Sequence, residues 1–180
     1  MKLSIVQSQV QSHIEEKFKN LAVQKAVRGQ LSVSKYKSRN AVSIRVTFSK
    51  DYLGTHISLK EPIFQNAYRA CGWWTINTTL SPDFWLFVLF GPEERSTDYI
   101  LVPRADLLKS LDVNHLARGH NNLVHSHLCV TNSGKCWEIR NLPKEQRREI
   151  AEGKYRGVER NFTEWLNNWT PLEQLNSEKS

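Results

Sequence analysis

The sequence predicts an α/β fold in which a mixed sheet is flanked by helices and followed by a helical C-terminal extension. Three observations predict this class: an amphipathic helical pattern opens the chain, period-two alternation follows it, and a continuous apolar run stands at Phe84–Phe90. Alternation is typical of a strand with one solvated face, and a short apolar run of a strand buried on both faces. We expect a core over residues 1–140 and an extension over residues 141–180, packed on the same domain.

The N-terminal part of the chain predicts one long helix and several strands. Apolar residues recur at spacings of three and four over residues 5–27, and Gly29 then supplies a stop signal, so we expect a helix there. Alternating runs follow at residues 31–33, 42–48 and 57–59. We expect the last two runs to form a hairpin, because a turn at residues 51–54 separates them.

The remaining elements are shorter. Residues 63–70 predict a helix, Phe84–Phe90 and residues 99–102 predict buried strands, and Pro103 opens a Leu-rich helix. Residues 124–130 and 136–139 predict a second hairpin. In the extension, one helix starts after Leu142-Pro143, and Asn161 with Glu164 predicts the start of another. Four apolar side chains share one face of that last helix: Phe162, Trp165, Leu166 and Trp169.

Composition excludes several classes of protein. An apolar fraction of 39% with six tryptophans is enough for a buried core, which excludes a disordered chain. No run approaches the roughly 20 apolar residues of a membrane helix, and the first residues lead into a polar amphipathic stretch rather than a secretory signal. Three cysteines are too few for a disulfide framework and suit a reducing interior. We therefore expect a cytoplasmic protein with no membrane partner.

The basic charge is concentrated in one segment. The formal net charge is +7, and between Arg28 and Lys60 seven lysines and arginines stand against Asp51 alone. A segment of this kind is typical of a protein that binds a polyanion such as nucleic acid. The alternative is a solvated basic face with no partner.

A short run of alternating cations is the most concrete binding feature. Lys35, Lys37 and Arg39 would project from one side of an extended chain at intervals of about 6.6 Å, near the phosphate repeat of about 7 Å. Arg45 and Lys50 complete the predicted nucleic-acid-binding residues. A hairpin whose cations only solubilise the chain is the alternative interpretation.

Over residues 31–111 the order of elements resembles the restriction-endonuclease-like superfamily. A helix, three strands with a hairpin, a helical connection and a very apolar strand follow one another, as in that family's core. Ile57-Ser58-Leu59-Lys60 looks like the family's strand that ends in acid-x-Lys, and Asp98-Tyr99-Ile100-Leu101-Val102-Pro103 resembles a later strand. The resemblance implies a restriction-endonuclease-like core and a nucleic-acid partner, DNA in the first place.

The same resemblance implies a Mg²⁺-dependent endonuclease. In that family two carboxylates hold the metal, and the metal activates water with the help of the lysine. Lys60 takes the place of the assisting base, and Glu16 or Asp51 is the candidate acid. The sequence departs from the pattern at both acids, since Ser58 stands where the glutamate is expected. A catalytically inactive DNA-binding or regulatory module of the same fold is therefore the alternative.

Histidines and cysteines raise the question of a zinc site. His125, His127 and Cys129 alternate along one predicted strand, and Cys136 lies across a short turn. Three such positions span about 13 Å, so at most two of them and Cys136 could reach one ion. Zinc is therefore not favoured, and we expect these side chains to pack singly.

The tryptophans define a third class of function. Trp165 and Trp169 keep helical register with apolar neighbours, which favours core packing. Trp73 and Trp74 are adjacent, so at least one of them faces outward and is a candidate for stacking on a base. The alternative is a protein-interaction factor whose Trp-rich tail docks a partner or a second subunit, as in a homodimer.

Overall fold

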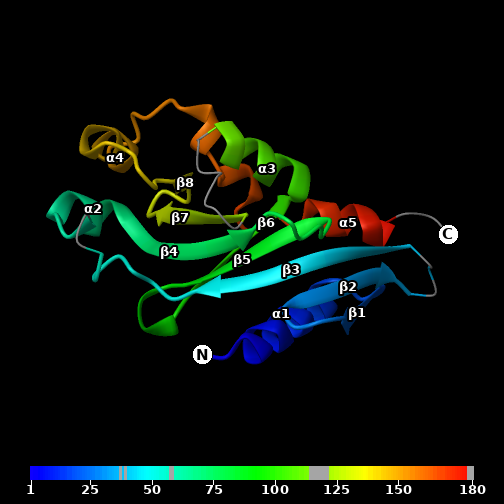
Figure 1. Ribbon diagram of the computed structural model, residues 1–180. Helices are drawn as coiled ribbons and strands as arrows, with labels where there is room; N and C mark the ends of the chain where they lie inside the picture. The colour runs from blue at the N-terminus through cyan, green and yellow to red at the C-terminus, as the bar shows by residue number, and fades with distance from the viewer. Residues whose placement is uncertain (37, 39, 57–58, 114–121, 178–180) are drawn as a thin grey trace.

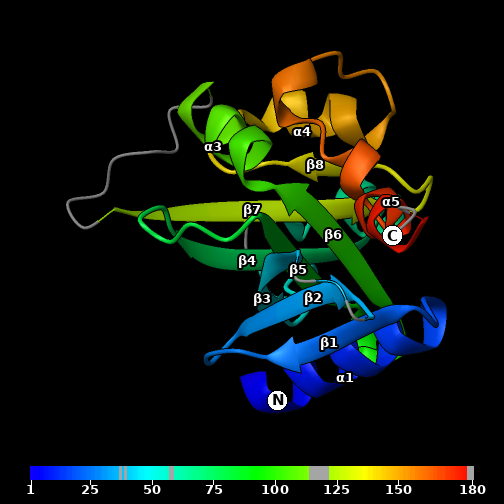
Figure 2. The ribbon, with the colours of Figure 1, turned by 90° about the vertical axis from the view of Figure 1, so that its right-hand side faces the viewer.

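Two β-sheets pack face to face, and helices cover their outer faces (Figures 1 and 2). The computed structural model describes residues 1–180 except 37, 39, 57–58, 114–121 and 178–180. The helices are α1 (Leu3–Lys17), α2 (Pro62–Ala67), α3 (Arg104–Val113), α4 (Lys144–Ala151) and α5 (Thr170–Ser177). The strands are β1 (Leu21–Lys25), β2 (Gln30–Lys35), β3 (Ala41–Ser49), β4 (Tyr68–Asn77), β5 (Phe84–Phe90), β6 (Thr97–Pro103), β7 (Leu123–Thr131) and β8 (Cys136–Glu138).

The larger sheet, called sheet A here, is mixed. Its order is β1-β2-β3-β5-β6, with β3 and β5 parallel and every other pair antiparallel. Side chains of β5 are buried on both faces, because Leu86 and Val88 pack against α1 while Trp85 and Phe87 pack against the second sheet. The α/β class, the mixed sheet and the buried strand at Phe84–Phe90 are thus confirmed.

The smaller sheet, called sheet B, is antiparallel in the order β4-β7-β8. One face of it packs on sheet A through Trp74, Ile76 and Leu128, and this layer is called the intersheet core. The other face is partly covered by α2 and α4, with Phe64 and Ile150 in contact with Cys71 and its neighbours. The predicted hairpin at residues 124–130 and 136–139 is confirmed as β7 and β8.

The predicted helix over residues 5–27 is wrong in its second half. The helix ends at Lys17, where Phe18 adopts an extended conformation and its carbonyl accepts a hydrogen bond from the Leu21 amide. Residues 21–25 form β1, which pairs with β2. Leu21 and Val23 fit the apolar spacing of a helix and of a strand alike, and pairing with β2 decides between the two.

The predicted hairpin between residues 42–48 and 57–59 is also wrong. The neighbours of β3 are β2 and β5, and among the described residues Leu59 lies in a 3₁₀ turn and Lys60 in no strand. The segment after β3 is hydrogen-bonded to β4 instead: the Tyr52 amide donates a hydrogen bond to the carbonyl of Cys71. Lys60 therefore does not stand on a sheet face; Ile57 and Ser58 lie outside the described residues.

The extension contains less helix than expected. Its first helix, α4, is confirmed, but Asn161 starts only a 3₁₀ turn at Thr163–Trp165, and α5 begins at Thr170. Trp165 packs beside the intersheet core, whereas Trp169 packs with α1 on the opposite face of sheet A. The two tryptophans therefore do not share one helix face, although both serve the core.

The close packing of the two sheets leaves no room for a side chain at Gly72. A Cβ atom at this position would lie 2.2 Å from Cη2 of Trp74 and 2.9 Å from Cδ1 of Leu89. We expect Gly72→Ala to lower the free energy of unfolding by about 1–3 kcal/mol, because the buried indole must move. Urea denaturation measures the change. Gly54→Ala is the control, since nothing lies within 4 Å of its added methyl group; equal stability of the two variants would contradict the prediction.

Candidate nucleic-acid interface

The side of sheet A that faces sheet B carries polar residues on β1, β2 and β3. Alternate residues of these strands, such as Leu31, Ile44 and Val46, are buried against α1, so the residues between them point the other way. These outward residues are partly or fully exposed, all except Ala22 are polar, and together they are called the polar strip: Ala22, Gln24, Gln30, Ser32, Ser34, Ser43, Arg45 and Thr47. Hydroxyl, amide and guanidinium groups are among those that hydrogen-bond to phosphate and sugar in protein–DNA complexes.

Cross-strand register places these groups in rows. Ser32 lies opposite both Gln24 on β1 and Ser43 on β3, and Gln30 lies opposite Arg45. Arg45 and Thr47 in turn lie beside Trp85 and Phe87 of β5, where the intersheet core begins. The polar strip therefore ends where sheet B starts to cover sheet A.

Arg45 is held at the edge of the polar strip by the β1–β2 turn. Its Nη1 donates to the carbonyl of Arg28 at 2.7 Å. Gly29 makes room for this, since a Cβ atom there would lie 3.3 Å from Cζ of Arg45, and its φ of +76° suits glycine. This hydrogen bond to the backbone holds the guanidinium in place. It uses one of the five N–H donors of Arg45 and leaves the others out of this contact.

Asp83 binds the polar strip at the start of β3. Its Oδ2 accepts hydrogen bonds from the amide of Ser43 at 2.7 Å and from the hydroxyl of Ser43 at 2.8 Å, and the Asp83 amide donates back to that hydroxyl. This carboxylate belongs to the Pro82-Asp83 pair of the sequence. It joins the first residues of β3 to the start of β5, which accounts for its position.

The predicted cations spread along the length of β3. Lys35 ends β2, and Lys50 follows β3 with its Nζ 5.4 Å from the ring centroid of Tyr52. At about 3.3 Å per residue the two ends of β3 are roughly 26 Å apart. Lys37 and Arg39 lie outside the described residues. Lys35 alternates with Leu31 and Val33 and therefore lies on the α1 face of the sheet, whereas Arg45 lies on the other face, so the described cations do not form one cluster.

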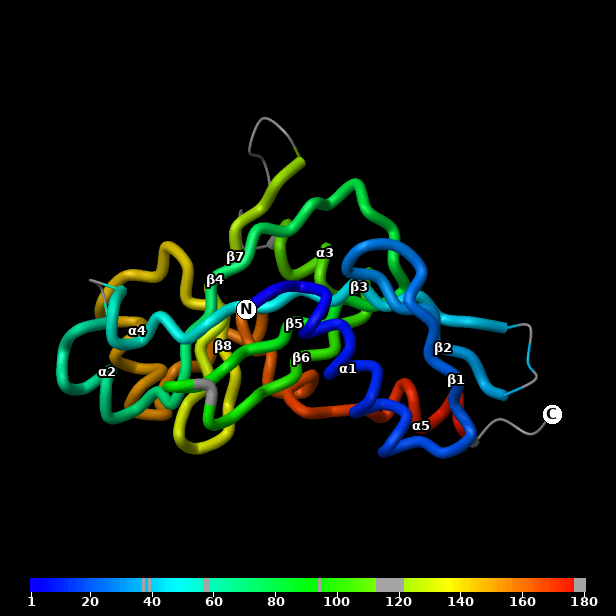
Figure 3. The backbone as a smooth tube through the Cα atoms, turned by 90° about the horizontal axis from the view of Figure 1, so that it is seen from below, coloured from blue at the N-terminus to red at the C-terminus, as the bar shows by residue number. Residues whose placement is uncertain are grey.

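The three predicted catalytic residues are not brought together. Glu16 lies on the α1 side of sheet A, in a shallow groove lined by Ser12 and Tyr99. Oδ1 of Asp51 accepts hydrogen bonds from two backbone amides after β3, and Lys60 is exposed just before α2. Figures 1 and 3 show α2 at one end of the molecule and the C-terminal part of α1 toward the other.

A second group of polar and aromatic side chains lies on the outer face of sheet B. Trp73 is 38% exposed, whereas Trp74 is buried, so the expectation that one of them faces outward is confirmed. The imidazoles of His56, His125 and His127 surround the Trp73 indole with ring centroids 6.2, 5.9 and 5.4 Å away. The guanidinium of Arg140 lies 6.0 Å from the indole centroid.

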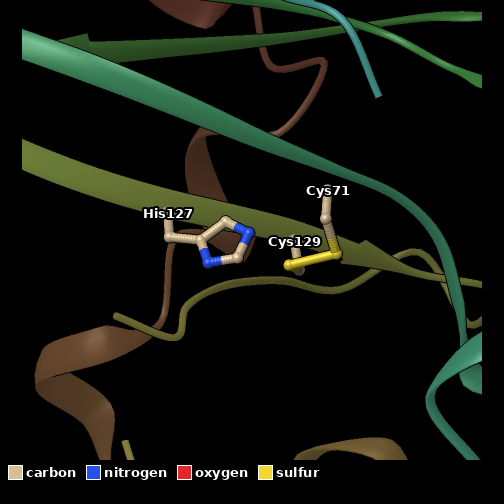
Figure 4. Close-up of side chains that lie close together, drawn as sticks. All are labelled: Cys71, His127 and Cys129. Carbon is tan, nitrogen blue, oxygen red and sulfur yellow. A yellow bond between two sulfur atoms is a disulfide. The ribbon is translucent and has the colours of Figure 1, made fainter. Parts of the chain in front are cut away.

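Behind this group, two cysteines and one histidine lie together (Figure 4). Cys71 and Cys129 stand opposite each other on β4 and β7 and form a disulfide, which the cysteine count did not lead us to expect. The metal-ligating atoms of Cys71, His127 and Cys129 all lie within 4.8 Å of one another. Burial lowers the pKa of His127 to about 3, and the nearby His56 and Arg147 add to this effect. Cys136 instead packs in the intersheet core.

A buried ion pair lies beneath the same strand. Glu138 is fully buried, and its Oε2 accepts a hydrogen bond of 2.6 Å from Nη1 of Arg160. Its Oε1 accepts from the backbone amides of His127 and Arg140. Burial raises the pKa of the Glu138 carboxyl to about 7, against the opposing effect of those amides and of Arg160. The pair holds β8 to the segment around Arg160.

Sequence reasoning did not identify several of these residues. Cys71 and His127 meet because of the β4–β7 register, and Arg160 meets Glu138 through a 3₁₀ turn; neither contact has a local sequence pattern. The polar strip could be predicted from the sequence, since Ser43, Arg45 and Thr47 alternate with apolar residues.

Comparison of the chain with protein-family models, with curated proteins and with solved structures gives no match. None of the helices in the described part of the chain is long and apolar enough to cross a membrane.

Proposed function

We propose that the protein binds nucleic acid, duplex DNA in the first place, along the polar strip and the β2–β3 hairpin beside it. The observation that carries the proposal is the polar strip itself: one face of β1, β2 and β3 in sheet A that offers hydroxyls, amides and Arg45 instead of an apolar surface. Its partly exposed groups point away from α1, on a surface long enough for several phosphates.

The charge around the polar strip supports this proposal. Between Arg28 and Lys60 the single acid is Asp51, and its Oδ1 accepts hydrogen bonds from the amides of Leu53, in the turn after β3, and of Cys71, on β4. Its carboxylate thus lies at the far end of β3 from the hairpin. On the strip itself Arg45 supplies the positive charge, and the Asp83 carboxylate lies at its other end, on Ser43.

We further propose that this sheet is a restriction-endonuclease-like core. The order of α1, the three-stranded meander β1–β2–β3, a connection that contains α2, and the apolar β5 parallel to β3 supports this assignment. Cleavage is not part of the proposal, because Glu16 lies across the sheet from the polar strip and Asp51 bonds to backbone amides. Docking through the Trp-rich tail is not favoured either, since Trp169 is buried and Trp165 packs on the intersheet core.

A salt titration with a charge-matched control tests the binding surface. We expect Lys35→Ala, Lys37→Ala and Arg39→Ala together to weaken binding of a short DNA duplex and to reduce the slope of log K against log salt by about 2–3, since each lost phosphate contact removes about 0.9. Fluorescence anisotropy at several salt concentrations measures both. The control removes Lys109, Lys154 and Arg156, an equal charge on α3 and after α4.

The outcomes separate the hypotheses. An equal loss of slope in both triple variants would mean that only net charge matters and that the contact surface lies elsewhere. Binding by the wild-type protein that is absent, or insensitive to salt, would end the nucleic-acid proposal. Nicking of a plasmid in Mg²⁺ or Mn²⁺, lost in Lys60→Ala, would restore the endonuclease hypothesis.

A further inference from the structure

A thiol–imidazole cluster stands on the outer face of sheet B, away from the polar strip. It consists of Cys71 on β4 and of His127 and Cys129 on β7, and all three side chains are buried. Figure 4 shows the His127 imidazole beside the two sulfur atoms, on the same face of the paired strands. Because Cys71 and Cys129 are directly opposed in the register, the sheet itself fixes the separation of the two sulfurs.

His127 carries a buried nitrogen without a hydrogen-bond partner in the described part of the chain. This atom is Nε2, and the side chain is 97% buried, at a residual exposure of 3%. Buried polar groups are ordinarily satisfied, so an orphaned nitrogen next to two sulfurs needs an explanation. A bound cation supplies one, since an imidazole nitrogen coordinates a metal with the lone pair that is otherwise unused.

We propose that the reduced protein binds one zinc ion through the sulfurs of Cys71 and Cys129 and the imidazole of His127. Two thiolates and one imidazole are ligands that zinc prefers, and two thiolates cancel the charge of the ion in this buried place. Three protein ligands leave a fourth position for water, on a site that His56 and Trp73 border through their ring contacts with His127.

The ligand set differs from the one that the sequence brought forward. Cys136 is buried in the intersheet core on the opposite face of sheet B, and Cys71 takes its place because β4 pairs with β7. His127 and Cys129 are two residues apart on one strand, so the objection that three ligands on one strand span too great a distance does not apply.

The disulfide and the zinc site exclude each other. A dithiol reductant transfers two electrons and two protons to the Cys71–Cys129 bond, which yields two protein thiols and the oxidised, cyclic form of the reductant. Zinc then displaces the two thiol protons, and these are released to solvent. The same two sulfurs therefore form a disulfide when the protein is oxidised and ligate zinc when it is reduced.

Metal analysis of the wild-type protein in two redox states is the first test. We expect about one zinc ion per chain after reduction, incubation with zinc and removal of unbound metal, and none after oxidation. Cobalt in place of zinc should give the intense thiolate-to-cobalt absorption of a two-thiolate site. Equal zinc content in the two states, or cobalt without thiolate absorption, would overturn the proposal.

Variants assign the ligands. We expect Cys129→Ser and His127→Ala to lose the zinc, and Cys136→Ser to keep it as the matched control, since Cys136 is an equally buried free cysteine. Retention of zinc in Cys129→Ser or in His127→Ala would place the ion elsewhere. The wild-type comparison does not depend on how these variants fold, and neither experiment depends on nucleic-acid binding.

Discussion

Arg160→Ala is expected to lower the free energy of unfolding by about 3–5 kcal/mol at mildly alkaline pH. The substitution leaves the fully buried Glu138 carboxylate without the guanidinium that donates to it at 2.6 Å, and the two backbone amides and the charge of Arg140 must then stabilise it. Urea denaturation at several pH values measures the change.

The loss should depend on pH in a defined direction. Burial already raises the pKa of Glu138 above its usual value, and removal of Arg160 raises it further. In the variant the unfolded state therefore releases its proton at a lower pH than the folded state, so stability falls as the pH rises through the interval between the two pKa values. At acidic pH both states are protonated, and the effect of the substitution should shrink.

Two further variants isolate the ion pair. Arg156→Ala removes an exposed arginine close by in the sequence and should change stability by less than about 0.5 kcal/mol. Glu138→Gln combined with Arg160→Ala should recover part of the loss, since a neutral amide tolerates burial better than an unpaired charge. A loss in Arg160→Ala that is the same at acidic and alkaline pH would assign the effect to packing and not to charge.

Phe87→Ala is expected to cost about 3–5 kcal/mol of stability, because it opens a cavity where the two sheets meet. Phe87 is fully buried on β5, and its ring makes an edge contact with Trp74 of sheet B at a centroid distance of 5.4 Å. It also stacks beside Trp85. Thermal or urea unfolding measures the loss.

The position of Phe87 defines its controls. Phe87→Leu keeps most of the apolar volume and should cost less than half as much. Phe48→Ala removes a partly buried ring from the α1 side of sheet A and should also have a smaller effect. If Phe48→Ala and Phe87→Ala were equally destabilising, the intersheet core would not be the main link between the sheets.

The sequence predicts most of the strands that alternate or that are apolar throughout, and it fails where two periodicities coincide. Phe84–Phe90 leaves little choice, because it is too short for most helices and apolar on both faces. Leu21 and Val23 satisfy both patterns, and only pairing with β2 makes them a strand. The predicted partner of β3 was wrong, because the strand that pairs with it, β5, comes after β4 in the sequence, and β4 belongs to the other sheet.

The candidate sites differ in the same way. Alternation alone predicts that Ser43, Arg45 and Thr47 share a solvated face, and the structure places them in the polar strip. No local pattern links Cys71 to Cys129, because the two cysteines are 58 residues apart and their contact depends on the register between their strands. Glu138 and Arg160 are likewise brought together by tertiary packing, and neither is unusual in its sequence neighbourhood.

The parallel pairing of β3 with β5 has a consequence for the order in which the protein folds. The hairpins of β1, β2 and β3 close locally, whereas β3 must wait for β5, and β4 must wait for β7. Contacts between segments far apart in the chain form late, because the entropy of loop closure opposes them. A newly made chain therefore exposes Ala41–Ser49 as an unpaired edge, which other chains can join. β3 is thus the central strand of the finished sheet A, but it is an edge strand until β5 has been synthesised and has paired with it.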